Sequence, residues 1–239
     1  MHRFYAETMD GNLAELSPED VHHALNVLRL IPGSEAELIF QGRRYRAVFR
    51  EGGILEALEA LPSSEPSLQI TLFQGLPKAD KMDWIVQKAV EIGVVRIVPV
   101  LLSRCVVRLS SRDAEKKQLR WSRIAREAGK QCGRCILPEV CLPVPLSAVP
   151  EYAADLEACA VPWEQAAAFG PLAFTEAHPD LHSLGILIGP EGGLEPAEID
   201  FLRPRFEPLT LGPRILRTET AGLAASAAFL ALRGEMEHI

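Results

Sequence analysis

Short apolar segments alternate with helix-like stretches through the last two thirds of the chain. The apolar segments, each of a length typical of a buried strand, are residues 68–73, 97–101, 156–161 and 184–188. Between and after them, residues 79–92, about 113–131 and 221–232 are expected to form helices, with Gly93 placed to cap the first. This alternation predicts an α/β domain with a mainly parallel sheet.

A Pro/Ser-rich stretch at 62–67 suits a short linker, which divides the chain into two predicted domains, residues 1–66 and 67–239. In the first domain, β-rich segments at 36–40 and 45–49 flank a Gln-Gly pair and predict a hairpin. Residues 18–30 have helical spacing through Val21, Leu25 and Leu28. We therefore expect a small β-barrel with one helix.

Two loops near the C-terminal end are the strongest functional signal. Residues 189–193 (Gly-Pro-Glu-Gly-Gly) follow one apolar segment, and residues 211–220 follow another. Because the carboxyl ends of parallel strands meet at one edge of a sheet, both loops are expected to open at that edge, where α/β folds bind ligands. Neither a Gly-x-Gly-x-x-Gly fingerprint nor a P-loop occurs in the chain. A nucleotide-like ligand without a pyrophosphate fits these loops best.

The two loops resemble the cofactor loops of the RsmE family, bacterial methyltransferases of the SPOUT superfamily that act on N3 of a uridine in 16S ribosomal RNA. Runs at 2–5, 76–82, 87–89 and 131–134 match the same family in the same order, so the resemblance covers nearly the whole chain. Two positions depart from the family pattern, which usually has Glu where this chain has Lys130 and Ser103.

The resemblance implies the fold and the partners. Residues 1–66 would form a PUA-like domain that contacts RNA, and residues 67–239 a SPOUT methyltransferase domain with a trefoil knot. Periodicity alone favours an unknotted chain. The family also implies a homodimer and 16S rRNA, free or in the assembled small subunit, as substrate.

By matching position, the resemblance implies that S-adenosylmethionine is bound in a bent form between the two loops. The implied cofactor-binding residues are Leu187, Ile188, Gly189, Pro190, Glu191, Gly192, Gly193, Leu211, Gly212, Ile215, Leu216, Arg217, Thr218, Thr220 and Ala221. Simpler roles stay open for some of them. Glu191 also suits a loop before a helix start, where a carboxylate favours the helix dipole, and the two threonines suit helix caps.

The reaction points to Arg217 and Glu191 as the catalytic candidates. Uracil N3 carries a proton on its pairing edge, so the base must be unpaired and turned out of its stack. If that proton leaves near pH ~9 to 10 and an ordinary Glu accepts near about 4.3, the mismatch costs about 7 kcal/mol. An unshifted Glu191 or Glu219 is therefore a poor base. The Arg217 guanidinium would instead stabilise the developing uracil anion, and Glu191 would hydrogen-bond ribose or substrate.

A net charge of −7 argues against sequence-independent RNA binding, so local charge matters more. At about 100° per residue, six cations between 116 and 134 share a sector of roughly 120°. This stripe fits an RNA-backbone track or a solvated helix face equally well. The candidate RNA contacts are Arg3, Arg29, Arg43, Arg44, Lys78, Lys81, Arg123, Arg126, Lys130 and Arg134.

Five cysteines, an odd number, argue for reduced thiols. The Cys132-x-x-Cys135 pair lacks properly spaced partners, so no metal site is expected. No window approaches eighteen apolar residues and the first residues lack the apolar middle of a signal peptide, which predicts a cytoplasmic protein without a membrane segment.

The sequence therefore predicts a dimeric, S-adenosylmethionine-dependent uridine N3-methyltransferase of 16S rRNA. Two alternatives stay open. One is a ribose 2′-O-methyltransferase of the same superfamily, although the Ser-Leu-Asn run usual there is absent. The other is a noncatalytic rRNA-binding or assembly protein that keeps the loops only as structure.

Overall fold

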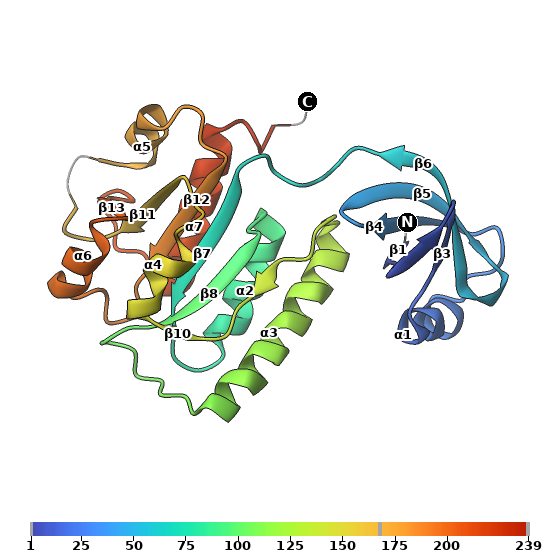
Figure 1. Ribbon diagram of the computed structural model, residues 1–239, viewed down its shortest axis with the longest axis horizontal. Helices are drawn as coiled ribbons and strands as arrows, with labels where there is room; N and C mark the ends of the chain where they lie inside the picture. Colours follow the sequence, from blue (N-terminus) through green and yellow to red (C-terminus); the bar gives the residue numbers. More distant parts are fainter. Residues whose placement is uncertain (1, 167–168, 238–239) are drawn as a thin grey trace. The chain divides into compact units, whose positions relative to one another are not determined.

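The computed structural model describes residues 2–166 and 169–237, and the chain forms two compact units (Figure 1). The first comprises Met1–Glu65 and Gly129–Leu137, and the second Pro66–Ala128 and Pro138–Ile239. The prediction assigned all of 67–239 to one domain, whereas by compactness Gly129–Leu137 groups with the first unit.

The first unit is built on a six-stranded sheet of mixed direction. In the order β1-β4-β5-β6-β3-β2, β1 pairs with β4 in parallel and every other pair is antiparallel. Its strands are β1 (His2–Tyr5), β2 (Thr8–Asp10), β3 (Leu13–Glu15), β4 (Glu35–Phe40), β5 (Arg43–Arg50) and β6 (Ile54–Leu61). Phe4, Leu38, Phe49 and Leu55 fill its core. The likeness to a PUA domain stays a prediction.

The predicted hairpin is confirmed as β4 and β5, which pair from Glu35–Val48 to Phe40–Arg43. Gln41 and Gly42 form its turn, with φ of 46° and 76°. Positive φ at both central residues is the geometry that matches the twist of paired strands.

The predicted helix over 18–30 is only partly correct. An α-helix, α1, spans Pro18–His22, and a π-helical turn, η1, continues over His23–Val27. A π-turn closes i to i+5 hydrogen bonds, here from Leu28 N–H to His23 O at 3.0 Å, and so rotates the face that follows. As a result Ala24 is buried while Leu25, expected on the core face, is 45% exposed.

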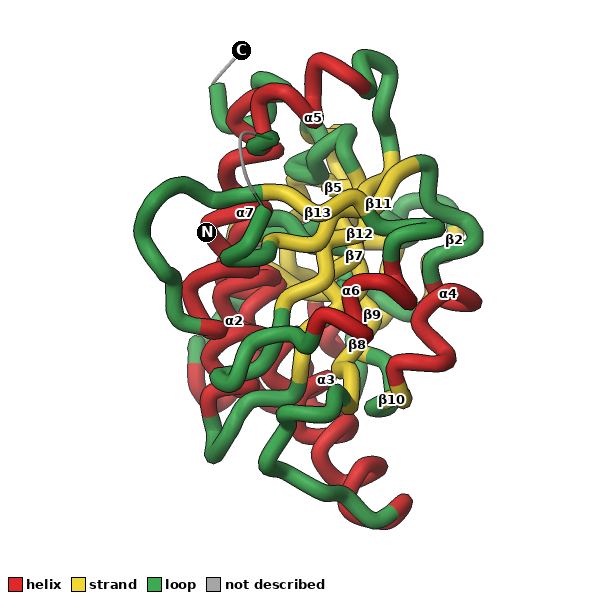
Figure 2. The backbone as a smooth tube through the Cα atoms, turned by 90° about the vertical axis from the view of Figure 1, so that its left-hand side faces the viewer, coloured by secondary structure: helices red, strands yellow, loops and turns green. Residues whose placement is uncertain are grey.

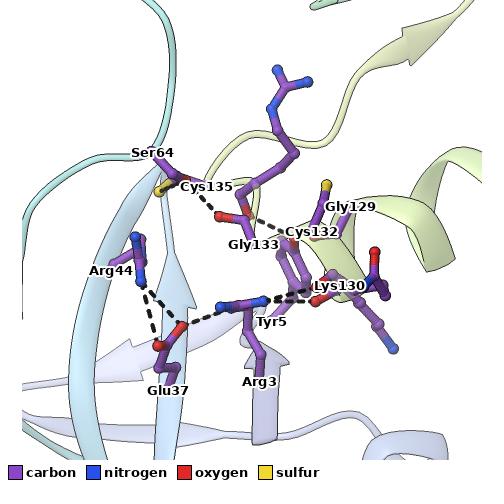
Figure 3. A network of polar contacts seen from close by, with 12 residues as sticks. Arg3, Tyr5, Glu37, Arg44, Ser64, Gly129, Lys130, Cys132, Gly133 and Cys135 are labelled. Atoms are coloured by element: carbon purple, nitrogen blue, oxygen red, sulfur yellow. Dashed lines mark hydrogen bonds and ion pairs between the residues drawn. The ribbon is translucent and has the colours of Figure 1, made fainter. Parts of the chain in front are cut away.

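Residues 129–137 join the first unit through polar contacts with the sheet strands (Figure 3). The Arg3 guanidinium donates to Lys130 O at 2.9 Å and pairs with Glu37 at 2.7 Å. Glu37 also pairs with Arg44 at 3.3 Å, and the arginine hydrogen bonds hold its pKa below the ordinary value although burial opposes them. Gly133 has φ of +87°, and a Cβ there would lie 2.9 Å from the Arg3 guanidinium. Glycine is therefore required at this turn.

The same segment is fastened at its other side by a buried tyrosine and a buried ion pair. Tyr5 O–H donates to Arg134 O at 2.7 Å, and burial raises the pKa of this phenol well above its ordinary value. The Arg134 guanidinium, 4% exposed, lies 2.7 Å from Glu65. These contacts explain why residues far along the chain belong to the first unit.

The second unit contains a seven-stranded sheet in which every pair is parallel, as predicted. The order is β10-β8-β7-β12-β11-β13, with β9 also paired to β8. The strands are β7 (Gln69–Gly75), β8 (Arg96–Leu101), β9 (Glu139–Val140), β10 (Val144–Pro145), β11 (Ala158–Pro162), β12 (Ser183–Ile188) and β13 (Glu207–Leu209).

Helices cover this sheet, with α2 and α7 on one side of the strands and α4 and α6 on the other (Figure 2). The helices are α2 (Lys81–Ile92), α3 (Ser111–Cys132), α4 (Val149–Tyr152), α5 (Pro171–Ala177), α6 (Pro196–Leu202) and α7 (Thr218–Leu232). Short 3-10 turns, η2 (Glu51–Gly53) and η3 (Leu146–Ala148), complete the elements. The Ala-rich α7 packs on α2, α5, β7 and β12 of its own chain. The trefoil knot stays a prediction.

Candidate functional site

The two glycine- and proline-rich loops meet at the carboxyl edge of the parallel sheet. The first follows β12 and leads to α6, and the second follows β13 and leads to α7. Between them lies a cavity of about 500 Å³, a volume suited to a drug-sized ligand. Its lining residues are Pro162, Glu164, Ile188, Gly189, Pro190, Glu191, Gly192, Gly193, Leu194, Ile215, Leu216, Arg217, Thr218 and Ala221.

Most of the predicted ligand residues therefore share one cavity. Of the others, Leu211 and Gly212 line a neighbouring cavity of about 490 Å³, Leu187 is fully buried in the core, and Thr220 lines neither cavity. Ile215, 90% exposed, lines both cavities. That these residues bind a cofactor stays a prediction.

A third loop, after β11, was missed by the sequence analysis. Pro162 and Glu164 line both cavities, and Trp163 lines the second. The loop carries no glycine signature, but it follows an apolar segment that had already been assigned to the same sheet. Its position at the end of a parallel strand was the available signal.

Close backbone approach explains the glycines around the first loop. A Cβ on Gly75, at the end of β7, would lie 2.7 Å from both Ile188 O and Pro190 N. A Cβ on Gly192 would lie 2.9 Å from the Arg104 Cβ. The helix after the loop begins with a capping box in which Glu195 and Glu198 each accept the other's backbone N–H. These contacts hold the first loop on the sheet edge.

A buried hydrogen-bond relay joins the two loops. Gln74 Nε2 donates to Thr218 Oγ1 at 2.9 Å, and Thr218 Oγ1 donates to Gly189 O at 2.7 Å. Gln74 is fully buried and Thr218 is 6% exposed. The single hydroxyl proton of Thr218 is thus engaged within the protein, so this threonine acts on the loop backbone and has no proton left to donate to a ligand.

A lysine joins the same loops on the outside. Lys81 Nζ lies 3.1 Å from Glu191 Oε1 and 3.1 Å from Glu219 Oε2, and Lys78 N–H donates to Glu191 Oε1 at 3.1 Å. Burial raises the pKa of Glu191, but backbone N–H groups and Lys81 outweigh it and the net pKa is lowered. The backbone N–H of Glu219, together with Lys81, lowers the pKa of the Glu219 carboxyl. Both carboxylates are held ionised, which makes them weaker proton acceptors than ordinary glutamates.

Arg217 lies at the N-cap of α7, where its carbonyl accepts the N–H groups of Thr220 and Ala221 at 2.8 Å each. Its side chain is exposed and lines the first cavity. Among the described residues its guanidinium has no hydrogen-bond or ion-pair partner, so its five donors are available to a ligand.

The loop after β8 reaches the same edge of the sheet. Arg104 Nη1 donates to Gly192 O at 2.8 Å, and its Nε lies 3.6 Å from Glu195 Oε1. At the position that departs from the family pattern, Ser103 contributes its backbone N–H, which donates to Glu198 Oε1 at 2.9 Å. This hydrogen bond comes from the main chain of residue 103, so it does not depend on the side chain at that position.

The candidate RNA contacts differ in how accessible they are. Four are exposed (Arg29, Arg43, Lys78, Arg123) and five are half-buried (Arg3, Arg44, Lys81, Arg126, Lys130). Arg134 is a correction to the predicted stripe, because it lies beyond the end of α3 and its buried guanidinium pairs with Glu65. Lys130, the second departure from the family pattern, lies 2.8 Å from Asp20. Whether the others contact RNA stays a prediction.

All five cysteines are free thiols, four of them buried. Burial raises the pKa of Cys141 to about 12 and of Cys159 to about 11, which leaves both protonated and unreactive near neutrality. Over residues 2–166 and 169–237, no group of three or more His, Cys, Asp or Glu side chains is placed to hold a metal ion. In the same ranges, no helix has the length and apolar character to cross a membrane.

Residues 64–230, which contain the parallel sheet and both loops at its carboxyl edge, match a family model described as an RNA methyltransferase domain. Ribosomal RNA small subunit methyltransferase E of Bacillus subtilis is 33% identical over 95% of each chain. That of Aquifex aeolicus is 32% identical over 92% of this chain and 95% of its own. The chain belongs to the ribosomal RNA small subunit methyltransferase E family, which confirms the resemblance found in the sequence.

The solved structures agree. Ribosomal RNA small subunit methyltransferase E from Neisseria gonorrhoeae, crystallised with S-adenosyl methionine, superimposes with a TM-score of 0.81 at 34% identity, covering 97% of this chain and 98% of that one. The folds of the two units, in the same order along the chain, are thus shared with the Neisseria gonorrhoeae protein, which was crystallised with this cofactor.

Proposed function

We propose that this protein transfers a methyl group from S-adenosylmethionine to N3 of a specific uridine in 16S ribosomal RNA of the small subunit. One observation carries the proposal: the loops 189–193 and 211–220 both line one cavity, the second through residues 215–218, in a chain of the ribosomal RNA small subunit methyltransferase E family. Proteins with α/β sheets catalyse many different reactions, and membership of this family, with a cavity at this edge of the sheet, favours methyl transfer.

The cavity fits the cofactor in size and in chemistry. Its volume of about 500 Å³ accommodates a molecule of that class. Gly189, Gly192 and Gly193 line the cavity with backbone atoms alone, so main-chain N–H and C=O groups there would bind the adenosine and methionine parts. When bound, the cofactor supplies an activated sulfonium methyl group.

The protein's own contribution is to hold the acceptor and to ease the loss of its proton. The Arg217 guanidinium is charged, has no partner among the residues that the structure describes and lies at the cavity wall, where it stabilises negative charge that develops on the uracil oxygens. Glu191 and Glu219 are kept ionised by their N–H and Lys81 contacts, so neither serves as the base. Glu191 acts instead as a fixed acceptor beside the substrate. The N3 proton is lost to bulk solvent in an equilibrium that the Arg217 guanidinium shifts toward the uracil anion.

The RNA, the assembly state and the location follow from the same proposal. Exposed arginines such as Arg29 and Arg43 on the first unit and Arg123 on α3 are the proposed backbone contacts. A homodimer is proposed on family grounds, with Ile215, 90% exposed, as a candidate at the boundary of the two copies. A cytoplasmic location follows from a ribosomal substrate.

Cofactor binding and methyl transfer test the proposal together. Isothermal titration with S-adenosylmethionine is expected to show saturable binding, and labelled methyl transfer to small subunits or free 16S RNA lacking the modification is expected to follow. Ala221 lines both cavities, so Ala221→Phe fills the cleft and abolishes binding, whereas Ala231→Phe, on the exposed end of α7, preserves it. Equal binding by the two variants would place the cofactor elsewhere. A wild-type protein that bound no cofactor would instead be a noncatalytic rRNA-binding protein.

A further inference from the structure

Lys81 is the first residue of α2, far in sequence from both loops of the cleft, yet its ammonium contacts both. It lies 3.1 Å from Glu191 in the first loop and 3.1 Å from Glu219 in the first turn of α7. The three side chains are 33%, 19% and 26% exposed. Their half-buried positions reduce screening by water, so charge is felt more strongly here than on an open surface.

We propose that Lys81 is a positioning residue for methyl transfer: its ammonium draws the two walls of the cofactor cleft together. This inference rests on the proposed function, because it assigns Lys81 to the geometry of the same cleft. Glu191 and Glu219 lie close enough for the negative charge of Glu191 to act on Glu219. Without a cation between them, two ionised carboxylates repel, and the repulsion pushes the two loops that carry them apart.

The contacts of Lys81 with Glu191 and Glu219 are a second connection between the two loops, besides the buried hydrogen bonds of Thr218. Thr218 fixes the carbonyl of Gly189 from inside, but neither partner in that relay holds the carboxylate-bearing part of the loop. Lys81, with the N–H of Lys78, is what holds Glu191. Because these ion pairs are still about one fifth to one third exposed, they contribute little to global stability, and the effect of Lys81 is expected in the shape of the cleft and only weakly in unfolding.

The same helix supplies a matched control. Lys88 pairs with Glu91 at 2.8 Å, and its side chain is 35% exposed, close to the 33% of Lys81. The Lys88 pair lies within α2 and lines neither cavity. Lys81→Met and Lys88→Met thus remove one half-exposed ammonium each from one helix, and only the first removal touches the cleft.

Titration with S-adenosylmethionine and steady-state transfer to small subunits test the inference on the full-length protein. Lys88→Met is expected to match wild type. Lys81→Met is expected to weaken cofactor binding about fivefold or more and to lower kcat as well, while Lys81→Arg recovers most of both. Lys81→Met with wild-type affinity and kcat would overturn the inference while leaving the proposed function standing. Absent binding by wild type and Lys88→Met alike would overturn the proposed function itself.

A second variant separates positioning from simple loss of structure. In the Lys81→Met background, Glu219→Gln removes the repulsion that the missing cation had balanced. The double variant is therefore expected to bind S-adenosylmethionine more tightly than Lys81→Met alone. Weaker binding by the double variant would overturn the electrostatic account, because a purely structural role predicts that the two losses accumulate.

Discussion

Replacing Thr218 by valine removes one hydroxyl from the buried relay between the loops and leaves the side-chain shape nearly unchanged. In the native protein this hydroxyl accepts from Gln74 Nε2 at 2.9 Å and donates to Gly189 O at 2.7 Å. Thr218→Val breaks both hydrogen bonds. The variant thus tests whether a buried polar contact, and not only apolar packing, sets the position of the first loop.

The cost follows from what each partner keeps. Gln74 Nε2 retains a hydrogen bond to Gly75 O at 3.1 Å, but its Oε1 is already buried without a partner. Within the described residues, Gly189 O has no other hydrogen-bond donor. Gly189 O is half-buried and loses its donor, whereas Gln74 Nε2 keeps its second acceptor, so the loss lies at the lower end of the range for an unpaired buried group, about 1–2 kcal/mol. For a unit of this size, that corresponds to a fall in Tm of roughly 2–8 °C.

Thermal and denaturant unfolding measure this cost, and titration with S-adenosylmethionine measures its effect on the cleft. Thr175→Val is the control, because within the described part of the chain the Thr175 hydroxyl donates only to Pro171 O in its own helix α5, at 2.8 Å, where such a bond contributes little. A double-mutant cycle with Gln74→Met should give a coupling of about 1 kcal/mol or more. Additive effects of the two changes, or a Thr218→Val protein as stable as Thr175→Val, would refute the relay.

Three further predictions concern the cleft. Arg217→Ala should lower kcat by about 10²-fold with little change in cofactor affinity, whereas Arg203→Ala, at the C-cap of α6, should be silent; equal kcat values would exclude the anion-stabilising role. The pKa values of Glu191 and Glu219, the two carboxylates that contact Lys81, are lowered in the folded protein. Their stabilising contribution is therefore complete above the unfolded pKa of about 4.5 and is lost as the pH falls through the folded pKa values. The free energy of unfolding, measured at pH 7, 5 and 4, should decline only at pH 4, and a decline already at pH 5 would contradict this. Gly75→Ala should lower the free energy of unfolding by about 2 kcal/mol, because the added Cβ would lie 2.7 Å from backbone atoms. Gly170→Ala should leave it unchanged, because there the added Cβ would lie 3.5 Å from the nearest backbone atom. Equal free energies of unfolding for the two variants would contradict the steric argument.

The alternation of strands and helices was predictable because short apolar segments and helical spacing are local signals. The parallel sheet, α2, α3 and α7 lie within a few residues of their predicted positions. The π-turn after α1 was not predictable, since Leu25 fits an α-helical face and only its burial in context decides otherwise. The same holds for Arg134, which extends a cationic stripe in sequence but is buried against Glu65, 69 positions away.

The candidate site also has a part that was predictable from the sequence and a part that was not. Glycines and prolines mark the two loops, so their meeting at one sheet edge was predictable from the rule that parallel strands end together. What fastens them was not: Gln74 and Lys81 lie on β7 and α2, and they reach Thr218 and Glu219 across 144 and 138 positions. Such contacts depend on how the elements pack, and no spacing in the sequence reports them. The Pro162–Glu164 loop was missed because it has no distinctive composition.

Nucleoside mass spectrometry of the RNA tests the central claim most directly. Small subunits that lack the modification are incubated with the protein and S-adenosylmethionine, and their 16S RNA is digested to nucleosides. The proposed mechanism predicts one new N3-methyluridine per RNA, formed by the wild-type protein and formed about 10²-fold more slowly by Arg217→Ala. A methyl group found on a ribose 2′-oxygen, or N3-methyluridine formed equally well by Arg217→Ala, would contradict it.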